Sequence, residues 1–387
     1  MSDPTNNDEL HLFRDMVLQV YDKEIAPHFD QWEHDKLIPR DTWKTLGAAG
    51  LLCTDMPEQY GGSGADYTVT QMIIEEAARL GFMGLSTGIG IHSNIVAPYI
   101  LHLGTEDQKQ HWLPKMAAGE AIAALAMTEP GAGSDVQGIR TSAVRDGDEW
   151  IINGSKIFIT NGIQADLVIL ACKTDPNAGA RGISLILVDT TLPGFKRGKQ
   201  LKKMGQHSND TAELFFDDLR VPAEAILGQE GKGFIHMMEE LPRERLGCAG
   251  QAVAAAQGAL EITVDYIQER KAFGQRIGDF QNSRFKVAEA KTEIEINRAF
   301  LNQCSREYSD GTLTADTAAM LKLASTEMQC RVIDECLQLF GGYGYMSEYP
   351  ISRYYVDARV QRIYAGSSEI MKEIVARTLL GKVQAPT

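Results

Sequence analysis

The feature that most constrains the fold of this 387-residue chain is that the spacing of its apolar residues changes twice along the sequence. From about residue 9 to 120, apolar residues recur at helical spacing. From about 121 to 232, short apolar runs alternate with turn residues, which is typical of strands. Long helical patterns return from 233 onward. Because single cores stop growing at roughly 250–300 residues, we predict several domains. They are a helical domain at 1–120, a β domain at 121–232 and a helical bundle at 233–387.

The middle region predicts an antiparallel β-barrel or sandwich rather than a parallel sheet. Trp150-Ile151-Ile152 and Ile157–Thr160 flank Asn153-Gly154, a dipeptide typical of a type I′ hairpin turn. A second Asn-Gly pair follows at 161–162. Three further strands are predicted at Leu167–Ala171, Ile183–Val188 and Ala212–Phe216.

The last region predicts an antiparallel four-helix bundle. Its first long helix, from Leu246 to Lys271, is rich in alanine and glycine, so neighbouring helices can approach it closely. The other helices are predicted at Asn282–Glu307, Thr314–Phe340 and Ser368–Leu380. The fold class is therefore α+β, with an N-terminal helical domain, a middle antiparallel β domain and a C-terminal helical bundle.

Composition excludes several classes of function. The formal net charge of −14 argues against nucleic acid as a partner, because phosphate binding requires surplus Lys and Arg. The six cysteines form no CxxC pair and the eight histidines no HExxH, so no metal site is predicted. No stretch reaches the roughly 20 apolar residues that span a bilayer. Because Met1–Glu9 lacks signal-peptide features, we expect a cytoplasmic protein without a membrane span.

Three glycine-rich segments are each compared with ligand-binding motifs and with ordinary turns or helix caps. The segment Thr128–Val136 contains a GxG, but Val136 fills the third glycine place and no βαβ pattern surrounds it, so a Rossmann fingerprint is excluded. A tight turn and an anion-binding loop both remain open for it. The segment Gly228–Gly233 lacks P-loop spacing and reads as a turn. The segment Gly341–Tyr345 has more glycine than a helix C-cap requires, which permits close approach to a ligand.

Glu244 lies in an acidic and basic segment at the predicted start of the first long helix. A carboxylate there suits the helix dipole, and a solvated glutamate paired with Arg243 or Arg245 would explain it without any catalytic role. The residues alone therefore do not identify a catalytic base.

Several segments, taken in order, resemble the acyl-CoA dehydrogenase family over essentially the whole chain. Each segment alone is weak, whereas the ordered set is highly specific. The set consists of Tyr60-Gly61-Gly62, Ala126–Asp135, Phe158–Gly162, Arg270–Gly274, Gln281, Gln338–Gly342 and Ile363–Ile370.

The resemblance implies FAD as the cofactor. Family members usually have Trp where this chain has Phe158, which keeps a stacking face and loses the indole donor. The flavin ring would be held by Leu125, Ala126, Met127, Thr128, Gly133, Ser134, Phe158, Ile159 and Thr160, with Ser367 and Glu369 also at flavin-binding positions. The adenosine diphosphate part would be lined by Arg270, Phe273, Gln281, Gln338, Gly341 and Gly342. In the family these residues come from a neighbouring subunit, which implies a homotetramer arranged as a dimer of dimers.

The resemblance also implies an acyl-CoA substrate and a position for the base. Many members carry the catalytic glutamate where this chain has Ala365, which cannot accept a proton. Long-chain and isovaleryl members carry it in a Glu-Arg-Leu context, which Glu244-Arg245-Leu246 matches. The resemblance therefore implies Glu244 as the base. Substrate contacts would come from Ser134, Arg245, Ala365, Gly366 and Arg377, with the backbone N–H of residue 365 as a donor to the thioester oxygen.

The implied reaction is dehydrogenation of a fatty acyl-CoA between its α and β carbons, with electrons passed to an electron-transfer flavoprotein. We expect a substrate with a medium-to-long linear acyl chain, and a branched-chain thioester is the alternative substrate. An acyl-CoA oxidase or flavin monooxygenase of the same fold is a close alternative. A non-enzymatic acyl-CoA-binding assembly protein is a more distant one, which Glu244 and the full set of flavin motifs disfavour.

Overall fold

A computed structural model describes residues 4–381, which form two compact units. Within the described residues, the first unit comprises residues 4–70, 87–203 and 207–240, and the second comprises 71–86, 204–206 and 241–381. The segment Met1–Glu9, which lacks signal-peptide features in sequence, lies outside the described residues over its first three positions. No helix within residues 4–381 combines the length and apolar content required to cross a bilayer.

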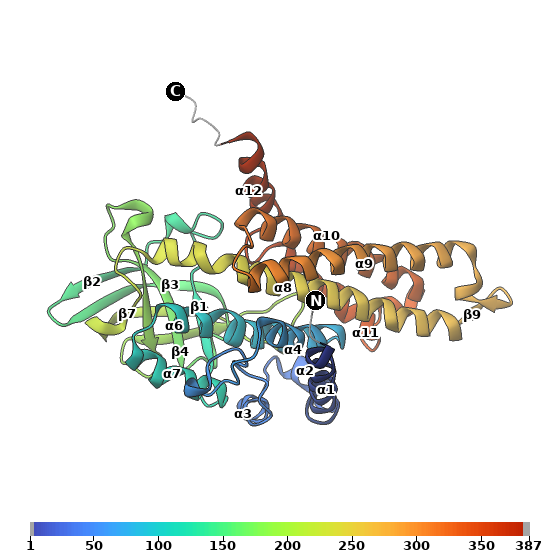
Figure 1. The fold of residues 1–387 in the computed structure, drawn as a ribbon, viewed down its shortest axis with the longest axis horizontal. Coiled ribbons are helices and arrows are strands. Elements are labelled where there is room, and N and C mark those ends of the chain that lie inside the picture. Colours follow the sequence, from blue (N-terminus) through green and yellow to red (C-terminus); the bar gives the residue numbers. More distant parts are fainter. Residues whose placement is uncertain (1–3, 382–387) are drawn as a thin grey trace. The chain divides into compact units, whose positions relative to one another are not determined.

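The first unit opens with short helices (Figure 1). Pro39 immediately precedes one of them, α3, and Thr105 caps another, α7, in a capping box with Gln108. Tyr21–Ile25 and Gly90–Val96 form π-helical turns. The helices are α1 (Pro4–Val20), α2 (Phe29–Asp35), α3 (Arg40–Ala48), α4 (Tyr67–Arg79), α5 (Met83–Ile89), α6 (Ala97–Leu103) and α7 (Glu106–Ala117). Helices α4 and α5 each have residues in both units.

Eight strands then form one sheet in the order β6-β7-β3-β2-β4-β5-β8, with β1 parallel to β4. The other extended pairings are antiparallel, as predicted. Strands are present at all three predicted apolar runs. The strands are β1 (Ala123–Ala126), β2 (Ser142–Asp146), β3 (Glu149–Thr160), β4 (Leu167–Lys173), β5 (Ile183–Asp189), β6 (Phe195–Gln200), β7 (Thr211–Pro222) and β8 (Ile226–Leu227).

The predicted hairpin turn at Asn153-Gly154 is wrong. Strand β3 continues through this dipeptide, and the chain reverses earlier, where Asp146 pairs with Glu149. Asn153 instead exchanges two 2.9 Å hydrogen bonds with Asp218 of β7. Gly154 has φ +148, and a Cβ there would lie 2.5 Å from the Thr141 hydroxyl oxygen. The dipeptide therefore forms a bulge and a close backbone approach rather than a turn.

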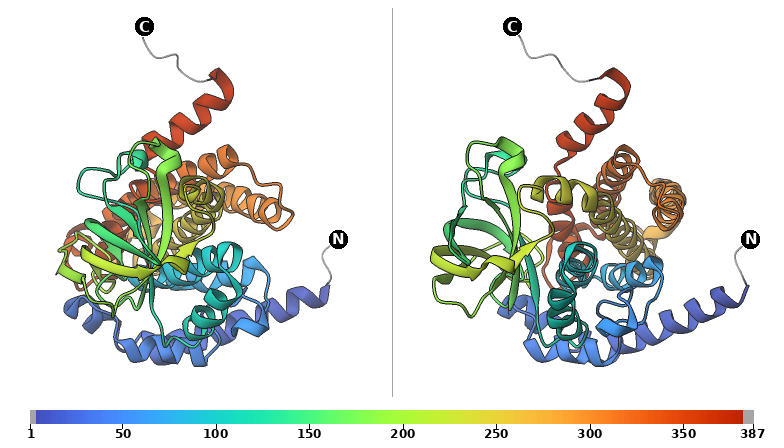
Figure 2. Two further views of the ribbon diagram at one scale, coloured as in Figure 1. Left: turned by 90° about the vertical axis from the view of Figure 1, so that its left-hand side faces the viewer. Right: turned by 60° about the vertical axis from the view of Figure 1, so that its left-hand side comes forward.

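The sheet is buried on both faces at its centre, and all seven residues of β4 are buried. Leu167, Ile169 and Ala171 pack with residues of α6 and α7. Val168 and Leu170 face a second core that includes Trp150. Figure 2 shows the curled sheet in green with the teal helices beside it. This two-sided burial explains why β4 reads as a continuous apolar run without alternation.

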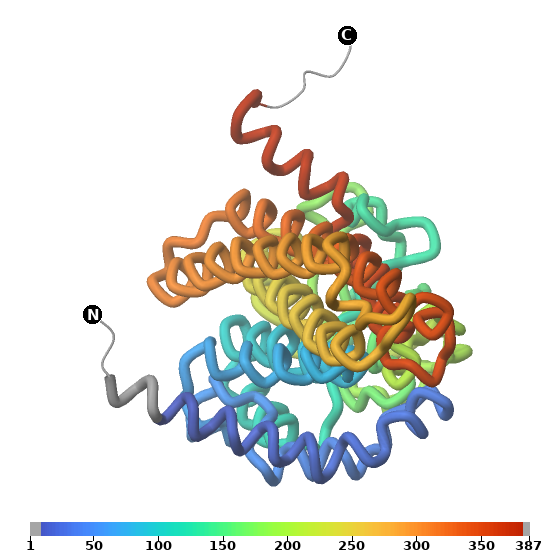
Figure 3. The backbone as a smooth tube through the Cα atoms, turned by 90° about the vertical axis from the view of Figure 1, so that its right-hand side faces the viewer, coloured from blue at the N-terminus to red at the C-terminus, as the bar shows by residue number. Residues whose placement is uncertain are grey.

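The second unit is helical, as predicted, and residues 241–269 of α8, α9 and α10 run side by side (Figures 1 and 3). A two-stranded hairpin, β9–β10, connects α8 to α9. Of α12, only Ser368 and Met371 are buried, so its later turns extend from the bundle. The elements are α8 (Gly233–Glu269), β9 (Lys271–Ala272), β10 (Gln275–Arg276), α9 (Gln281–Ser309), α10 (Ala315–Phe340), α11 (Pro350–Ala358) and α12 (Ser368–Leu380).

Helix α8 differs from its prediction at the N-terminal end. It begins at Gly233 and continues through Pro242, whereas we expected a start at Leu246. Burial of Met237 in a core of the first unit stabilises the additional turns. Further along, a Cβ on Gly258 would lie 1.8 Å from the carbonyl oxygen of Arg79 in α4. The predicted close helix approach at small residues is confirmed there.

His92, in the π-helical turn Gly90–Val96, joins three segments of the first unit. Its ring is fully buried and meets Trp43 edge-on at 5.3 Å. The backbone N–H of Ala123 donates to Nδ1 at 3.3 Å, and Nε2 lies 3.0 Å from the carbonyl oxygen of Met116. This pattern requires a neutral ring protonated on Nε2. Burial lowers the pKa of His92 to about 4, although the Met116 hydrogen bond opposes that shift.

We therefore expect acid to weaken the fold through His92. The unfolded imidazole binds a proton near pH 6.5, whereas the folded one binds it only near pH 4, so stability falls as the pH drops through this window. The loss between pH 7.5 and 4.5 should be about 2–3 kcal/mol. Urea unfolding of wild type and His92→Gln at both pH values measures it as a difference. Equal pH-dependent losses in the two proteins would contradict this assignment.

Candidate active site

The loop after β1 and the end of β3 lie together in the first unit. The N–H of Ile157 donates to the carbonyl oxygen of Thr128 at 3.0 Å. Leu125 and Ala126 end β1, and Glu129 and Ala132 exchange backbone hydrogen bonds in a tight turn. The structure thus brings together the flavin positions predicted at Leu125–Ser134 and at Phe158–Thr160. The turn that the sequence allowed is present between Glu129 and Ala132, and the use of the segment as a ligand loop stays a prediction.

A buried ion pair under this loop was missed by the sequence analysis. Lys156 of β3, with no exposed side-chain surface, donates at 2.8 Å to both the Glu129 carboxylate and the carbonyl oxygen of Met127. The same carboxylate accepts from the N–H groups of Arg140 and Thr141 at 2.6 and 2.9 Å. Burial opposes ionisation of Glu129, but the hydrogen bond and charge of Lys156 hold its pKa below the usual value. The Glu129 carboxylate therefore connects the start of the loop, where Glu129 lies, with its end at Arg140 and Thr141.

Phe158 faces outward beside the loop because β3 is irregular there. Pairing with β7 shifts register between Lys156 and Ile159, and Phe158 has φ 63. Its side chain is 64% exposed, whereas the next residue, Ile159, is buried. A bulge re-aims a side chain in this way and is common next to functional sites. Strand pairing resumes at Ile159 and Thr160.

These features fit a flat aromatic cofactor. The exposed ring of Phe158 offers a stacking face, and a Cβ on Gly131 or Gly133 would meet nothing within 4 Å. Ser134 is exposed in the same loop. An exposed aromatic ring beside a glycine-rich turn with open space around it is suited to stack on an isoalloxazine ring and to let the backbone approach it closely.

In the second unit, Glu244 is not the solvated first-turn glutamate that the sequence allowed. It lies well inside α8 and is only 7% exposed. The adjacent Arg243 donates to the Tyr308 hydroxyl at 3.1 Å and lies over that ring at 5.7 Å. A carboxylate at low exposure is expensive unless it has a specific role or partner.

Arg245 is also buried, at 5% exposure, and its Nε has no hydrogen-bond partner among the described residues. Burial lowers the pKa of Arg245, and the charge of Glu244 opposes that shift. Because a buried N–H group without an acceptor is unfavourable, a polar group of a ligand would stabilise Arg245 by accepting a hydrogen bond from its Nε. Arg245 is thus suited to the substrate contact predicted for it.

The loop before α12 holds the other predicted substrate positions of the second unit. Ala365 has φ 54 and Gly366 has φ 94. The buried Lys322 of α10 donates to the carbonyl oxygen of Gly366 at 2.8 Å. Ser367 caps α12 by accepting from the N–H of Ile370. A non-glycine residue held in the left-handed region is a feature that clusters at functional sites.

Family models describing the acyl-CoA dehydrogenase N-terminal, middle and C-terminal domains match residues 7–120, 124–219 and 231–380 in turn. The chain belongs to the acyl-CoA dehydrogenase family. The predicted membership and enzyme class are confirmed by these matches.

Curated relatives of this acyl-CoA dehydrogenase include long-chain and branched-chain enzymes. The mitochondrial long-chain specific acyl-CoA dehydrogenase of Mus musculus is 46% identical, over 96% of this chain and 86% of that protein. The mitochondrial isovaleryl-CoA dehydrogenase of Pongo abelii is 38% identical, over 96% and 88%. The solved acyl-CoA dehydrogenase of Geobacillus kaustophilus is 49% identical with a TM-score of 0.94, over 96% and 98%. The fold class is confirmed by this last match.

Two further similar structures are described with a flavin or a flavoprotein. A glutaryl-CoA dehydrogenase of Mycobacterium smegmatis in complex with FADH2 is 29% identical, with a TM-score of 0.91 over 97% of this chain and 95% of that chain. A chain from a solved structure described as the electron transferring flavoprotein of Acidaminococcus fermentans, in relation to flavin-based electron bifurcation, is 37% identical. Its TM-score is 0.93, over 96% of this chain and 98% of that chain. The acyl-CoA dehydrogenase family is FAD-dependent.

The predicted adenosine diphosphate positions of this family member gather at one end of the second unit. Arg270 lies over the ring of Tyr343 at 5.2 Å, and Phe273 is 96% exposed with φ 52 in the β9–β10 hairpin. Gln281 begins α9, and Gln338 lies just before the open Gly341 and Gly342. An almost fully exposed aromatic on a strained hairpin is suited to cover a ligand or partner.

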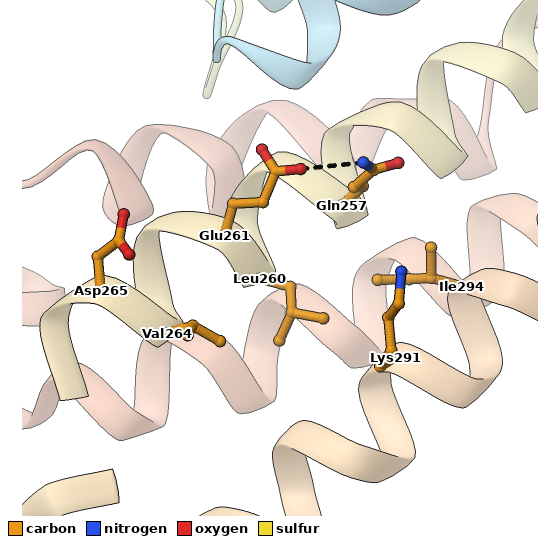
Figure 4. Close-up of a pocket in the computed structure, with 7 residues that line it drawn as sticks. All are labelled: Gln257, Leu260, Glu261, Val264, Asp265, Lys291 and Ile294. Carbon is orange, nitrogen blue, oxygen red and sulfur yellow. Dashed lines mark hydrogen bonds between the residues drawn. The ribbon is translucent and has the colours of Figure 1, made fainter. Parts of the chain in front are cut away.

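The remaining positions are peripheral. Arg377 pairs with Glu373 one turn away on exposed α12, and Glu369 is exposed, with its pKa lowered by its own N–H and the Ser367 hydroxyl. A surface groove of about 400 Å³ lies between α8 and α9 (Figure 4). Its lining, from Gln257 to Asp265 and from Lys291 to Ile294, contains none of the predicted site residues. The groove therefore does not mark the active site.

Proposed function

We propose that this acyl-CoA dehydrogenase oxidises medium-to-long acyl-CoA thioesters to trans-2-enoyl-CoA, with Glu244 as the base. The observation that carries the proposal is the burial of Glu244 at 7% exposure, in a chain whose alternative base position is Ala365. A carboxylate shielded from water is suited to act as a general base on a carbon acid. Ala365 leaves no other candidate at that position.

Glu244 would take the proton from the carbon next to the thioester carbonyl. Such a C–H is a very weak acid, so the developing negative charge on the carbonyl oxygen requires donors in place beforehand. The backbone N–H of Ala365 is the donor we assign to this oxygen, because a backbone donor survives replacement of the side chain. Arg245, with its orphaned Nε, would bind a polar group of the acyl-CoA.

FAD, when bound, supplies the acceptor for the hydride from the β carbon. The chain would hold its ring through Leu125–Ser134 and Phe158–Thr160, and the family resemblance assigns Ser367 and Glu369 to flavin-binding positions as well. The exposed hairpin and Gly341-Gly342 of a neighbouring subunit would cover its adenosine part, which requires at least a dimer, and by resemblance to the family we propose a homotetramer. We further propose an electron-transfer flavoprotein as the electron acceptor, in line with family members.

The test is anaerobic mixing of the purified holoenzyme with short, medium, long and branched saturated acyl-CoA thioesters, following the visible flavin band. We expect the fastest bleaching with medium or long straight chains. Bleaching only by branched thioesters would replace the substrate assignment with a branched-chain one. A flavin that none of them bleaches would refute acyl-CoA dehydrogenation by this chain.

A further inference from the structure

Lys322 interrupts the buried face of α10 with a charge. Its side chain has no exposed surface, and it shares that face with Ser325, Thr326 and Gln329, one and two turns further along. An unpaired ammonium in such a place is unfavourable compared with a methionine or leucine of similar volume. The residue therefore has a role that apolar packing would not fill.

The partner of this ammonium is a carbonyl oxygen in the predicted substrate loop. Lys322 Nζ lies 2.8 Å from the oxygen of Gly366, which directly follows Ala365. Ala365 has φ 54, a left-handed conformation that is unfavourable for an alanine. Such a conformation persists only where the surroundings determine it. The bond from Lys322 is one such determinant.

A second contact from the same helix holds the two flanks of the loop. Glu327 of α10 accepts from Arg362 Nε at 2.9 Å before the loop and from the Ser368 hydroxyl at 2.7 Å after it. Lys322 therefore acts on the middle of a loop whose ends are already tied. Its removal should loosen the conformation of residues 365 and 366 without releasing the loop from α10.

The ammonium also faces the part of α8 that carries the base. Burial lowers the pKa of Lys322, and the charge of Arg245 lowers it further, whereas Cys248, Glu327 and Glu369 oppose both effects. Arg245 and Cys248 are the α8 neighbours of Glu244. Lys322 thus lies between the α8 segment and the loop that must act on the same thioester.

We propose that Lys322 is a positioning residue for the thioester-carbonyl donor: its bond to Gly366 holds the Ala365 N–H in the orientation that stabilises the enolate oxygen. The inference rests on the proposed function, because it presumes that Glu244 deprotonates an acyl-CoA. It adds a residue that touches neither substrate nor cofactor, yet sets the geometry of the donor on which deprotonation depends.

The experiment uses holoenzyme and a 3-thia acyl-CoA, in which sulfur replaces the β carbon so that the α proton can exchange without hydride transfer. Exchange of the α proton for deuterium is followed by NMR, together with the dissociation constant of the thioester. In Lys322→Met the exchange rate should fall about 100-fold, as for loss of one oxyanion donor. The dissociation constant should change less than about threefold, because the donor acts mainly on the transition state.

Controls separate positioning from general damage. Lys286→Met removes an ammonium that pairs with Glu335 elsewhere in the second unit, and should leave both quantities unchanged. Lys322→Gln keeps a shorter, neutral donor and should lower the exchange rate about tenfold if one hydrogen bond is weakened, which also covers the case of an unfolded Met variant. Wild-type exchange rates in the folded Lys322 variants would overturn the proposal.

Hydrogen exchange of the backbone over residues 363–369 provides a reading that does not depend on catalysis. We expect faster exchange in Lys322→Met than in Lys286→Met. If wild type itself cannot exchange the α proton, the proposed function fails, and the loop measurement alone decides the role of Lys322. Unchanged loop exchange would then refute positioning, whereas faster exchange would sustain it.

Discussion

Glu244→Gln is expected to lower the rate of flavin bleaching by acyl-CoA at least about 1,000-fold while FAD and thioester binding persist. Glutamine keeps the size and hydrogen-bonding capacity of the side chain but cannot accept a proton. Because Glu244 is only 7% exposed, solvent cannot readily substitute for it as a base. Stopped-flow absorbance under anaerobic conditions measures the rate, and equilibrium titration measures binding.

Glu240→Gln is the matched control for this variant. Glu240 lies one turn earlier on α8, is 11% exposed and pairs with His102 at 2.6 Å. Its loss should change bleaching by less than about threefold, in the range of a peripheral hydrogen bond. An active Glu244→Gln enzyme, or an equal defect in Glu240→Gln, would reject Glu244 as the base.

Lys156→Met should produce the largest loss of stability and of FAD affinity in the first unit. It leaves the Glu129 carboxylate buried without its cation, a change that typically destabilises by about 3–5 kcal/mol. The same lysine holds the carbonyl oxygen of Met127, so the flavin loop should lose its fixed conformation. We expect FAD binding to weaken roughly tenfold or more.

The double variant Glu129→Gln/Lys156→Met tests this reasoning. Removing both charges should cost clearly less than the sum of the two single variants, because each single variant leaves a buried charge behind and the double variant leaves none. Urea unfolding and FAD titration of the apoprotein measure the two effects. Additive losses in the cycle would contradict a coupled pair. Undiminished FAD affinity in Lys156→Met would separate the pair from the cofactor.

Sequence periodicity predicted most of the secondary structure because local patterns reflect burial. The apolar run Leu167–Ala171 became β4, and the patterns of α9 and α10 ended within a few residues of their predicted bounds. It failed where local signals were ambiguous. Asn153-Gly154 favours a turn in isolation, yet its cross-strand bonds to Asp218 make a bulge instead. Pro242 suggested a helix start, yet α8 passes through it.

The residues of the candidate site also fall into two groups, those that local sequence patterns identify and those that depend on contacts between distant segments. The ordered motifs in the sequence pointed to a flavin, a thioester and Glu244 because those residue types stand in a family-specific order. The sequence could not reveal Lys156 or Lys322, whose partners lie 29 and 44 residues away in the chain. Each reads locally as an ordinary lysine. Only burial shows that it carries a charge into the interior.

The sequence by itself determined the order of helical and β regions and the chemistry expected of the chain, because periodicity and motif order are local properties. The tertiary structure decided which polar groups lose their water. Burial of Glu244, of the Glu129–Lys156 pair and of Lys322 depends on segments distant in the chain. Since the energy of a charge depends on its surroundings more than on its neighbours in sequence, these roles emerge only once the chain has folded.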